Sequence, residues 1–322
     1  MSSTDQKKQD TVVPRAQKSI TQPNQKKDMQ KIMDTDTKPT KVTPLTALGL
    51  HESGAVVPVF QYKGESYVLL LESAPVQTKS GEWWGTQTVG SDHMVMPVQD
   101  IPGGKTAQFD DKSYVKKYFP RDGPSTLDPA RVSTVDYPQL ESGIDAVIRE
   151  LDEEAHATVV IPNDYATRPH WIVDGGFTTS DGKRSQTVVL LLVTQCGSEG
   201  WASMTQNMFR RKNQMAFEKY NRWAAEHPDA PESEHWKHRP EFKDLRFVTL
   251  ESFGRALEQA NQQLLRYEKD KKTQPKGVIS VMMDHTGCPF FGVLRSWPVY
   301  ILYRSGIWDR VKTAANTRQD SW

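Results

Sequence analysis

Two apolar runs rich in β-branched residues lie close together near residue 60, and they most constrain what this chain can fold into. They read AVVPVF (55–60) and SYVLLLE (66–72), and the turn between them contains KGE. Apolar runs of this length on either side of a short glycine-containing turn predict a β-hairpin. A third run, TVVLLLVTQ (187–195), is apolar enough to be a central strand.

Helical periodicity alternates with further short strands along the rest of the chain. Apolar residues recur at helical spacing in three segments: 143–155, 203–226 and 251–267. Three other short runs predict strands: HMVMPV, ATVVI and RFVTL. Strands and helices follow one another without a regular βαβ repeat, so the predicted fold class is a mixed α/β sandwich.

Composition divides the chain into three expected parts. Residues 1–45 are rich in Gln, Lys, Asp, Thr and Pro and poor in large apolar side chains, so they predict a disordered polar tail. Residues 46–275 form the expected domain, with insertions at about 105–140 and 200–245. Residues 276–322 are expected to pack on this domain as a C-terminal extension.

Charge and cysteine content exclude some broad classes of protein. The formal net charge is +1, so no overall field selects nucleic acid or a membrane as partner, although residues 1–42 carry nine Lys/Arg against five Asp. Two cysteines, Cys196 and Cys288, are too few for a disulfide framework. Without a secretory signal or an apolar run near the ~20 residues of a membrane span, the sequence favours an intracellular, cytoplasmic protein.

The segment 143–155 combines an apolar face with an acidic edge. At 100° per residue, Glu150, Glu153 and Glu154 fall within an arc of about 100° beside the apolar stripe. Like charges at these spacings repel by roughly a few tenths of a kcal/mol each. A divalent cation such as Mg²⁺ or Mn²⁺ would reverse that cost, so the segment is either a solvated helix face or a metal site.

A longer pattern contains these acids. Glu141 is followed by SGIDAVI and then by Arg149-Glu150-Leu151-Asp152-Glu153-Glu154. This arrangement resembles the Nudix hydrolase signature, G-x5-E-x7-R-E-U-x-E-E-x-G-U, in which U is a bulky aliphatic residue. Upstream, MVMPV and Pro102-Gly103-Gly104-Lys105 are similar to the family's strand and glycine turn, and RFVTL with the helix after it is similar to its last strand and closing helix. The resemblance spans about 55–270 and implies a Nudix-type α/β/α sandwich with a mixed sheet.

Two departures from the signature bear on activity. The segment 105–140 stands where the signature has five residues. His156 stands where the family has glycine, and Ala157 replaces the aliphatic residue after it. That position follows the helix end, where a positive φ favours glycine, so histidine is expected to be strained there.

The resemblance implies roles for five charged residues. Glu150, Glu153 and Glu154 would hold Mg²⁺ or Mn²⁺, and one of them could help to deprotonate the attacking water. Arg149 would orient these acids by ion pairing. Glu141 would be either a further metal ligand or the partner of Arg149.

The implied reaction is hydrolysis of a phosphoanhydride bond in a nucleoside diphosphate linked to another moiety, such as ADP-ribose, a nucleotide sugar, a dinucleoside polyphosphate or capped RNA. Gly104 and Lys105 would bring backbone and a cation to the substrate. Trp84 could stack a base, although an aromatic pair such as Trp83 and Trp84 more often packs in a core. The alternative is a catalytically weak or inactive Nudix-fold module that binds nucleotide, RNA or a protein partner. The oligomeric state stays open, a homodimer included.

Two further features have no assigned role in that scheme. The segment FRRK (209–212), with Lys219 and Arg222, gives a basic helix interleaved with methionine and aromatic residues, which is either a solvated face or a grip for RNA or a partner. Some members of the family use a base from a later loop, for which this chain offers three acids: Glu199, Glu218 and Glu251.

Overall fold

The structure, a computed structural model, describes residues 53–77, 83–84, 86–89, 94–106, 141–178, 184–270 and 277–317, all of which belong to one compact unit. The expected polar tail and most of the insertion expected before the acidic helix lie outside the described residues.

The hairpin predicted near residue 60 is confirmed. Strand β1 (Ser53–Tyr62) pairs antiparallel with β2 (Glu65–Ser73). The two residues between them, Lys63 and Gly64, have φ values of 49° and 82°. Positive φ at both central positions is typical of the type I′ turn, whose twist matches that of the strands it joins.

The strands of the described residues form one large mixed sheet and one small ribbon. Their bounds are β5 (Thr86–Val89), β6 (Met94–Asp100), β7 (Gly103–Lys105), β8 (His170–Thr178), β9 (Arg184–Gln195), β10 (Phe242–Thr249), β11 (Gly277–Met283) and β12 (Pro289–Arg295) in the sheet, with β3 (Val76–Gln77) and β4 (Trp83–Trp84) in the ribbon. The sheet order is β11-β12-β6-β2-β1-β9-β8, while β10 pairs with β2, β5 with β6 and β7 with β1. Because β1 is parallel to β9 and β12 is parallel to β6, the sheet is mixed.

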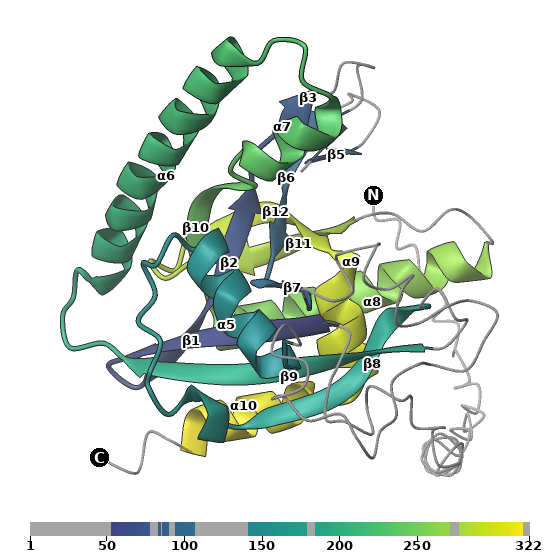
Figure 1. Ribbon diagram of the computed structural model, residues 1–322. Coiled ribbons are helices and arrows are strands. Elements are labelled where there is room, and N and C mark those ends of the chain that lie inside the picture. Colours follow the sequence, from purple (N-terminus) through teal and green to yellow (C-terminus); the bar gives the residue numbers. More distant parts are fainter. Residues whose placement is uncertain are drawn as a thin grey trace, which may run out of the picture. The chain divides into compact units, whose positions relative to one another are not determined.

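Helices cover both faces of this sheet (Figure 1). Their bounds are α5 (Gly143–Glu154), η1 (Tyr165–Thr167), α6 (Trp201–Glu226), α7 (Glu232–His238), α8 (Leu250–Lys269), α9 (Ser296–Pro298), the π-helical η2 (Val299–Arg304) and α10 (Trp308–Thr317). On one face of β1, Val56 packs with Val147 and Leu151 of α5. On the other face, Val57 packs with Phe253 of α8. The alternation along β1 therefore produces two cores and the expected α/β/α sandwich. None of the helices among the described residues is both long and apolar enough to cross a membrane.

Two of the sequence predictions about strands have opposite outcomes. The run at 187–195 lies within β9, which is flanked by β1 and β8 and is central as predicted. The run ATVVI is not a strand, so that prediction is wrong. The chain turns back onto the end of α5, where Thr158 Oγ1 donates to the Ala155 carbonyl at 2.6 Å. After this turn Val159 packs into the core with α5, while Val160 is 77% exposed.

Residues 277–317 belong to the sheet and to one of its cores. β12 pairs with β6, and β11 pairs with β12, so both strands extend the large sheet at one edge. Val278, Met282 and Leu294 are buried in the same core as α8. Two strands of this segment thus belong to the large sheet, and several of its buried residues belong to one of the two cores.

Candidate active site

The acidic helix α5 is held close to the sheet by its first turn. Ser142 caps the helix, because its Oγ accepts from the Asp145 N–H at 3.1 Å. Gly54 of β1 faces this turn, which leaves no room for a side chain at residue 54. With Val147 and Leu151 buried against the sheet, the acidic edge of α5 lies beside the glycine strand β7.

Arg149 joins the residues of the acidic motif to one another. Its Nε and Nη2 donate to the two carboxylate oxygens of Glu141, at 2.8 and 3.1 Å. Its Nη1 donates to Glu150 at 2.8 Å and lies 3.4 Å from Glu153. Nη2 also donates to the Lys105 carbonyl at 3.1 Å. Arg149 therefore ties α5 to the segment before it and to β7, and Glu141 is one of its ion-pair partners.

The glycines of β7 lie so close to β1 and to the acids of α5 that a side chain at either position would collide. Gly103 N–H donates to Glu154 Oε2 at 3.0 Å. A Cβ on Gly103 would lie 2.5 Å from the Gly54 carbonyl oxygen, and one on Gly104 would lie 2.4 Å from Oε1 of Glu150. The glycine turn thus brings backbone groups directly to two of the predicted metal ligands.

Gly104→Ala is therefore expected to lower turnover by roughly a hundredfold, because a displacement of about 1 Å in a reacting group has that effect. The added methyl group would push the flexible end of Glu150 away, so the free energy of unfolding should change by less than about 1 kcal/mol. Turnover and urea unfolding of the variant test this. Gly200→Ala, at a glycine with open space around it, is the control. Unchanged turnover in Gly104→Ala would contradict the placement of Glu150.

Two carboxyl groups on this edge hold their protons more tightly than usual. Burial raises the pKa of Glu154 well above its usual value, and the charges of Glu241 and Glu150 add to this, while the Gly103 N–H acts against it. Burial also raises the pKa of Glu150, against the opposing effect of Arg149. No basic residue lies in the last turn of α5, where the helix dipole also disfavours negative charge.

Three residues near these acids were missed by the sequence analysis: Asp100, Glu241 and Arg295. Arg295 Nη1 lies 3.0 Å from Asp100 Oδ2, and its Nη2 lies 4.0 Å from Glu241 Oε1. Burial raises the pKa of Asp100 to about 6, against the opposing charge of Arg295. Glu241 directly precedes β10. The run RFVTL predicted this strand to start at Arg246, four residues after its observed start at Phe242, so Glu241 did not stand out as a residue at a strand end.

The acids expected from later loops lie elsewhere: Glu199, Glu218 and Glu251. Glu218 accepts from Gln214 within α6, and Glu251 pairs with Arg255 within α8. The structure describes the side-chain surroundings of two of the three residues predicted to bind substrate. Gly104 and Lys105 lie beside the α5 acids. Trp84 belongs to β4, and its side chain lies outside the described part of the chain, so base stacking stays a prediction.

His156 adopts the left-handed conformation that the signature predicts for its glycine. Its φ is 50°, its N–H donates to the Glu153 carbonyl at 3.3 Å, and the Ala157 N–H donates to the Asp152 carbonyl at 2.8 Å. These two bonds form a Schellman motif, in which glycine is the usual residue. A histidine at this position carries a strain of roughly 1–2 kcal/mol.

Helix α6 holds this strained turn in place. The His156 ring is hydrogen-bonded to Asn213 at 3.0 Å and lies 5.2 Å from the Phe209 ring. Lys212 Nζ donates to the carbonyls of His156 and Ala157, at 2.8 and 3.0 Å. The expected insertion that contains α6 therefore supports the end of the acidic helix.

His156→Gly is expected to leave stability nearly unchanged, because relief of about 1 kcal/mol of strain offsets the lost hydrogen bond. His156→Ala keeps the strain and loses the contacts with Asn213 and Phe209, so it should cost about 1–2 kcal/mol. Urea unfolding of both variants measures the difference. Equal stability of the two would show that the backbone strain at residue 156 is negligible.

The acidic edge has the donor chemistry of a divalent-cation site, without a finished ligand set. Carboxylate oxygens suit Mg²⁺ or Mn²⁺, and burial raises the pKa of Glu150 and Glu154, so a bound cation would favour their charged forms. Within the described residues, no group of three or more His, Cys, Asp or Glu side chains is arranged to hold a metal ion. Glu150 and Glu154 instead accept from Arg149 and Gly103, so a metal would have to replace some of these contacts.

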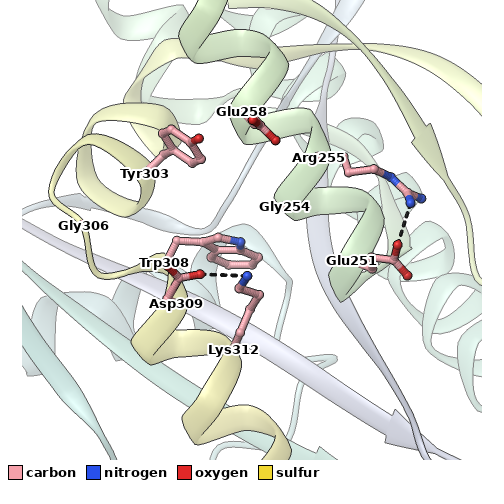
Figure 2. A pocket seen from close by; sticks show the side chains of 9 residues that line it. All are labelled: Glu251, Gly254, Arg255, Glu258, Tyr303, Gly306, Trp308, Asp309 and Lys312. Atoms are coloured by element: carbon pink, nitrogen blue, oxygen red, sulfur yellow. Dashed lines mark hydrogen bonds and ion pairs between the residues drawn. The ribbon is translucent and has the colours of Figure 1, made fainter. Parts of the chain in front are cut away.

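A cavity of about 380 Å³ lies between α8 and α10, on the other face of the sheet (Figure 2). Its lining includes Trp308 and two ion pairs, Arg255 with Glu251 at 2.6 Å and Lys312 with Asp309 at 2.8 Å. Both cations of the lining are already paired, and of the residues considered for catalysis only Glu251 lines it, where it pairs with Arg255. The candidate active site is therefore the acidic edge of α5.

Three solved structures are similar to parts of this chain. C. elegans Ap4A hydrolase is 16% identical over 46% of this chain and 70% of its own, with a TM-score of 0.18. The NUDIX domain of Shewanella oneidensis NrtR, complexed with ADP ribose, is 15% identical over 53% and 73%, with a TM-score of 0.21. A MutT/nudix family protein from Enterococcus faecalis is 11% identical over 91% and 73%, with a TM-score of 0.28.

No protein-family model matches the chain, and no curated protein matches it. TM-scores as low as these do not establish a common fold. Membership of the Nudix family therefore stays a proposal, and its support comes from the motif and the contacts around α5.

Proposed function

We propose that this chain is a Nudix-type pyrophosphohydrolase that uses Mg²⁺ or Mn²⁺ to cleave a phosphoanhydride bond in a nucleoside diphosphate linked to another moiety. The supporting observation is that the parts of the motif meet in space. Arg149 binds Glu141 and Glu150, while Glu154 accepts from Gly103 of the glycine turn. An acidic helix with a merely solvated face would not need this contact with the glycines.

Glu150, Glu153 and Glu154 would hold the metal ion. When bound, a divalent ion orients the diphosphate, neutralises developing charge and lowers the pKa of the attacking water. Glu141 has both oxygens engaged with Arg149, so in this proposal it positions Arg149 and is not a ligand.

Glu241 is the candidate general base. Its side chain is 61% exposed, which leaves it accessible to water, and its charge acts on both Glu150 and Glu154. Burial by contrast raises the pKa of Glu154, so a bound metal ion would favour its charged form. Lys105 is exposed beside the acids and would attract the phosphates of the substrate.

Turnover of a nucleotide panel tests the proposal. The panel contains ADP-ribose, nucleotide sugars, NADH, dinucleoside polyphosphates and capped RNA, each with Mg²⁺ or Mn²⁺ and phosphate-coupled detection. We expect metal-dependent turnover of at least one compound, and a loss of roughly 100- to 10,000-fold in Glu153→Gln/Glu154→Gln. Asp152→Asn, on the exposed side of the same helix, is the matched control. A folded protein that hydrolyses none of these compounds would refute the proposal.

The alternative is a catalytically weak or inactive Nudix-fold module that binds nucleotide, RNA or a protein partner. The observation in its favour is that Glu150 accepts from Arg149 and Glu154 accepts from Gly103, so carboxylate oxygens that a metal ion would need are already hydrogen-bonded. Thermal unfolding separates the two functions, because a metal that binds the folded state must stabilise it. Stabilisation by Mg²⁺ or Mn²⁺ supports the hydrolase, and nucleotide binding without any metal effect supports the module.

A further inference from the structure

The outward face of α6 carries a row of exposed methionines. Met204, Met208 and Met215 are 61%, 48% and 63% exposed. At 100° per residue, Met208 and Met215 lie about 40° and 20° from Met204 around the helix axis. The buried residues Phe209 and Asn213 lie about 140° and 180° from Met204, so the methionines are on the side that faces away from the domain.

Three cations lie along the same line: Arg211, Lys219 and Arg222. Each is within about 60° of Met204 around the axis. Among the described residues, none of the three takes part in an ion pair with an acid. The cations of α6 that lie nearer the domain are engaged, Arg210 with Asp244 at 2.6 Å and Lys212 with the turn after α5. We call these three methionines and three cations the methionine stripe. Glu218 lies on the same side, about 40° from Met204, and accepts from Gln214.

A solvated helix surface has no need of methionine. Good helix formers such as Glu, Gln and Lys would keep the helix and remain soluble. Methionine instead offers a flexible, polarisable side chain that adapts to the apolar groups of another molecule, and apolar residues gathered on a surface mark interaction sites.

The charge of α6 selects the kind of partner. The helix contains five Lys/Arg and two Glu, so a second copy of it would be repelled. Residues 1–42 of the chain contain nine Lys/Arg and five Asp, so they are also a poor match. A partner must supply acids for the cations and apolar side chains for the methionines. An acidic amphipathic helix supplies both, whereas RNA supplies negative charge without apolar side chains.

We propose that the methionine stripe of α6 is a docking surface for an acidic amphipathic helix of another protein. From Met204 to Arg222 the stripe is about 27 Å long, which matches a partner helix of about 18 residues. Apolar residues of that helix would cover the methionines, and its acids would pair with the outward cations. The surface does not depend on the reaction at α5.

The probe is a synthetic helix of about 18 residues with Leu on one face and Glu on the other, labelled with fluorescein. We expect fluorescence anisotropy to show binding that weakens as salt is raised. Met204→Gln/Met208→Gln/Met215→Gln should weaken binding roughly tenfold or more through lost apolar burial. Arg211→Gln/Lys219→Gln/Arg222→Gln should weaken binding and its salt dependence. Leu265→Gln removes an exposed apolar side chain from α8 and should have no effect.

Other outcomes would overturn the proposal. These are no binding of the peptide, or equal affinity of the wild type and the methionine variant when both are shown to be folded by circular dichroism. Tighter binding of an oligouridylate of about 20 nucleotides, sensitive to the cations and not to the methionines, would make the surface a nucleic-acid site. Self-association that is lost in the methionine variant would make it a contact between copies of this chain.

Discussion

Replacing Glu154 by glutamine is expected to stabilise the metal-free protein and to remove most of its turnover. Burial and the charges of Glu241 and Glu150 raise the pKa of Glu154, so its charged form costs the folded state free energy. Glutamine keeps the shape and can still accept from the Gly103 N–H. We expect a gain of about 1–2 kcal/mol in the free energy of unfolding with a chelator present. Turnover should fall by roughly 100- to 10,000-fold.

The same carboxyl predicts how stability changes with pH. A carboxyl group whose pKa is higher in the folded chain stabilises the folded state while it is protonated. This stabilisation is complete below the unfolded pKa of about 4.3 and is lost as pH rises through the folded pKa. Glu154 and Glu150 have raised pKa values, and Asp100, with a pKa of about 6, acts in the same direction. Metal-free protein unfolded in urea should lose stability as pH rises from about 4 through the pKa of Asp100 at about 6. Glu154→Gln should lose less over that range.

Asp152→Asn separates this effect from the general charge of α5. Asp152 is exposed on the same helix, and its replacement should change the free energy of unfolding by no more than about 0.5 kcal/mol. If both variants stabilise the protein equally, the repulsion belongs to the whole helix and not to Glu154 in particular. If Glu154→Gln destabilises the protein, the carboxylate is satisfied without metal, and the main support for a cation site is lost.

Local patterns in the sequence predict much of the fold and one part of the site. The β1–β2 hairpin, the central strand β9 and the helix α5 follow from spacing, because each depends on burial of one face or on a short turn. For the same reason the spacing of the α5 acids along the chain is enough to place them on one edge of the helix.

The rest of the site depends on contacts between distant segments. Asp100 and Arg295 meet because β6 pairs with β12, and no pattern within either strand names its partner. Arg295 interrupts an apolar run, which from the sequence alone is only a break in that run. His156 is recognisable in the sequence as a departure from the signature, yet its support comes from Asn213 on α6. Spacing thus identifies one helix of a site, and tertiary pairing supplies the rest.

Gly54→Ala is expected to cost about 3 kcal/mol of folding free energy and to reduce turnover at the same time. A Cβ on Gly54 would lie 2.3 Å from the Gly143 carbonyl oxygen and 2.3 Å from Cγ2 of Val147. The carbonyl belongs to the first turn of α5, so the helix must shift away from β1 to make room. Because Glu150 and Glu154 meet β7 from this helix, the shift also misplaces both acids, with roughly a hundredfold loss of turnover for about 1 Å.

Comparison of Gly54→Ala with Gly104→Ala distinguishes the seating of the helix from the position of one carboxylate. At Gly104 the obstacle is the flexible end of Glu150, so turnover should fall with little loss of stability. At Gly54 the obstacle is backbone, so both quantities should fall together. Gly197→Ala, with no atom within 4 Å of the added carbon, is the control for urea unfolding and turnover. If Gly54→Ala is as stable as that control, α5 does not rest on β1 as the structure has it, and its acids do not meet the glycines of β7.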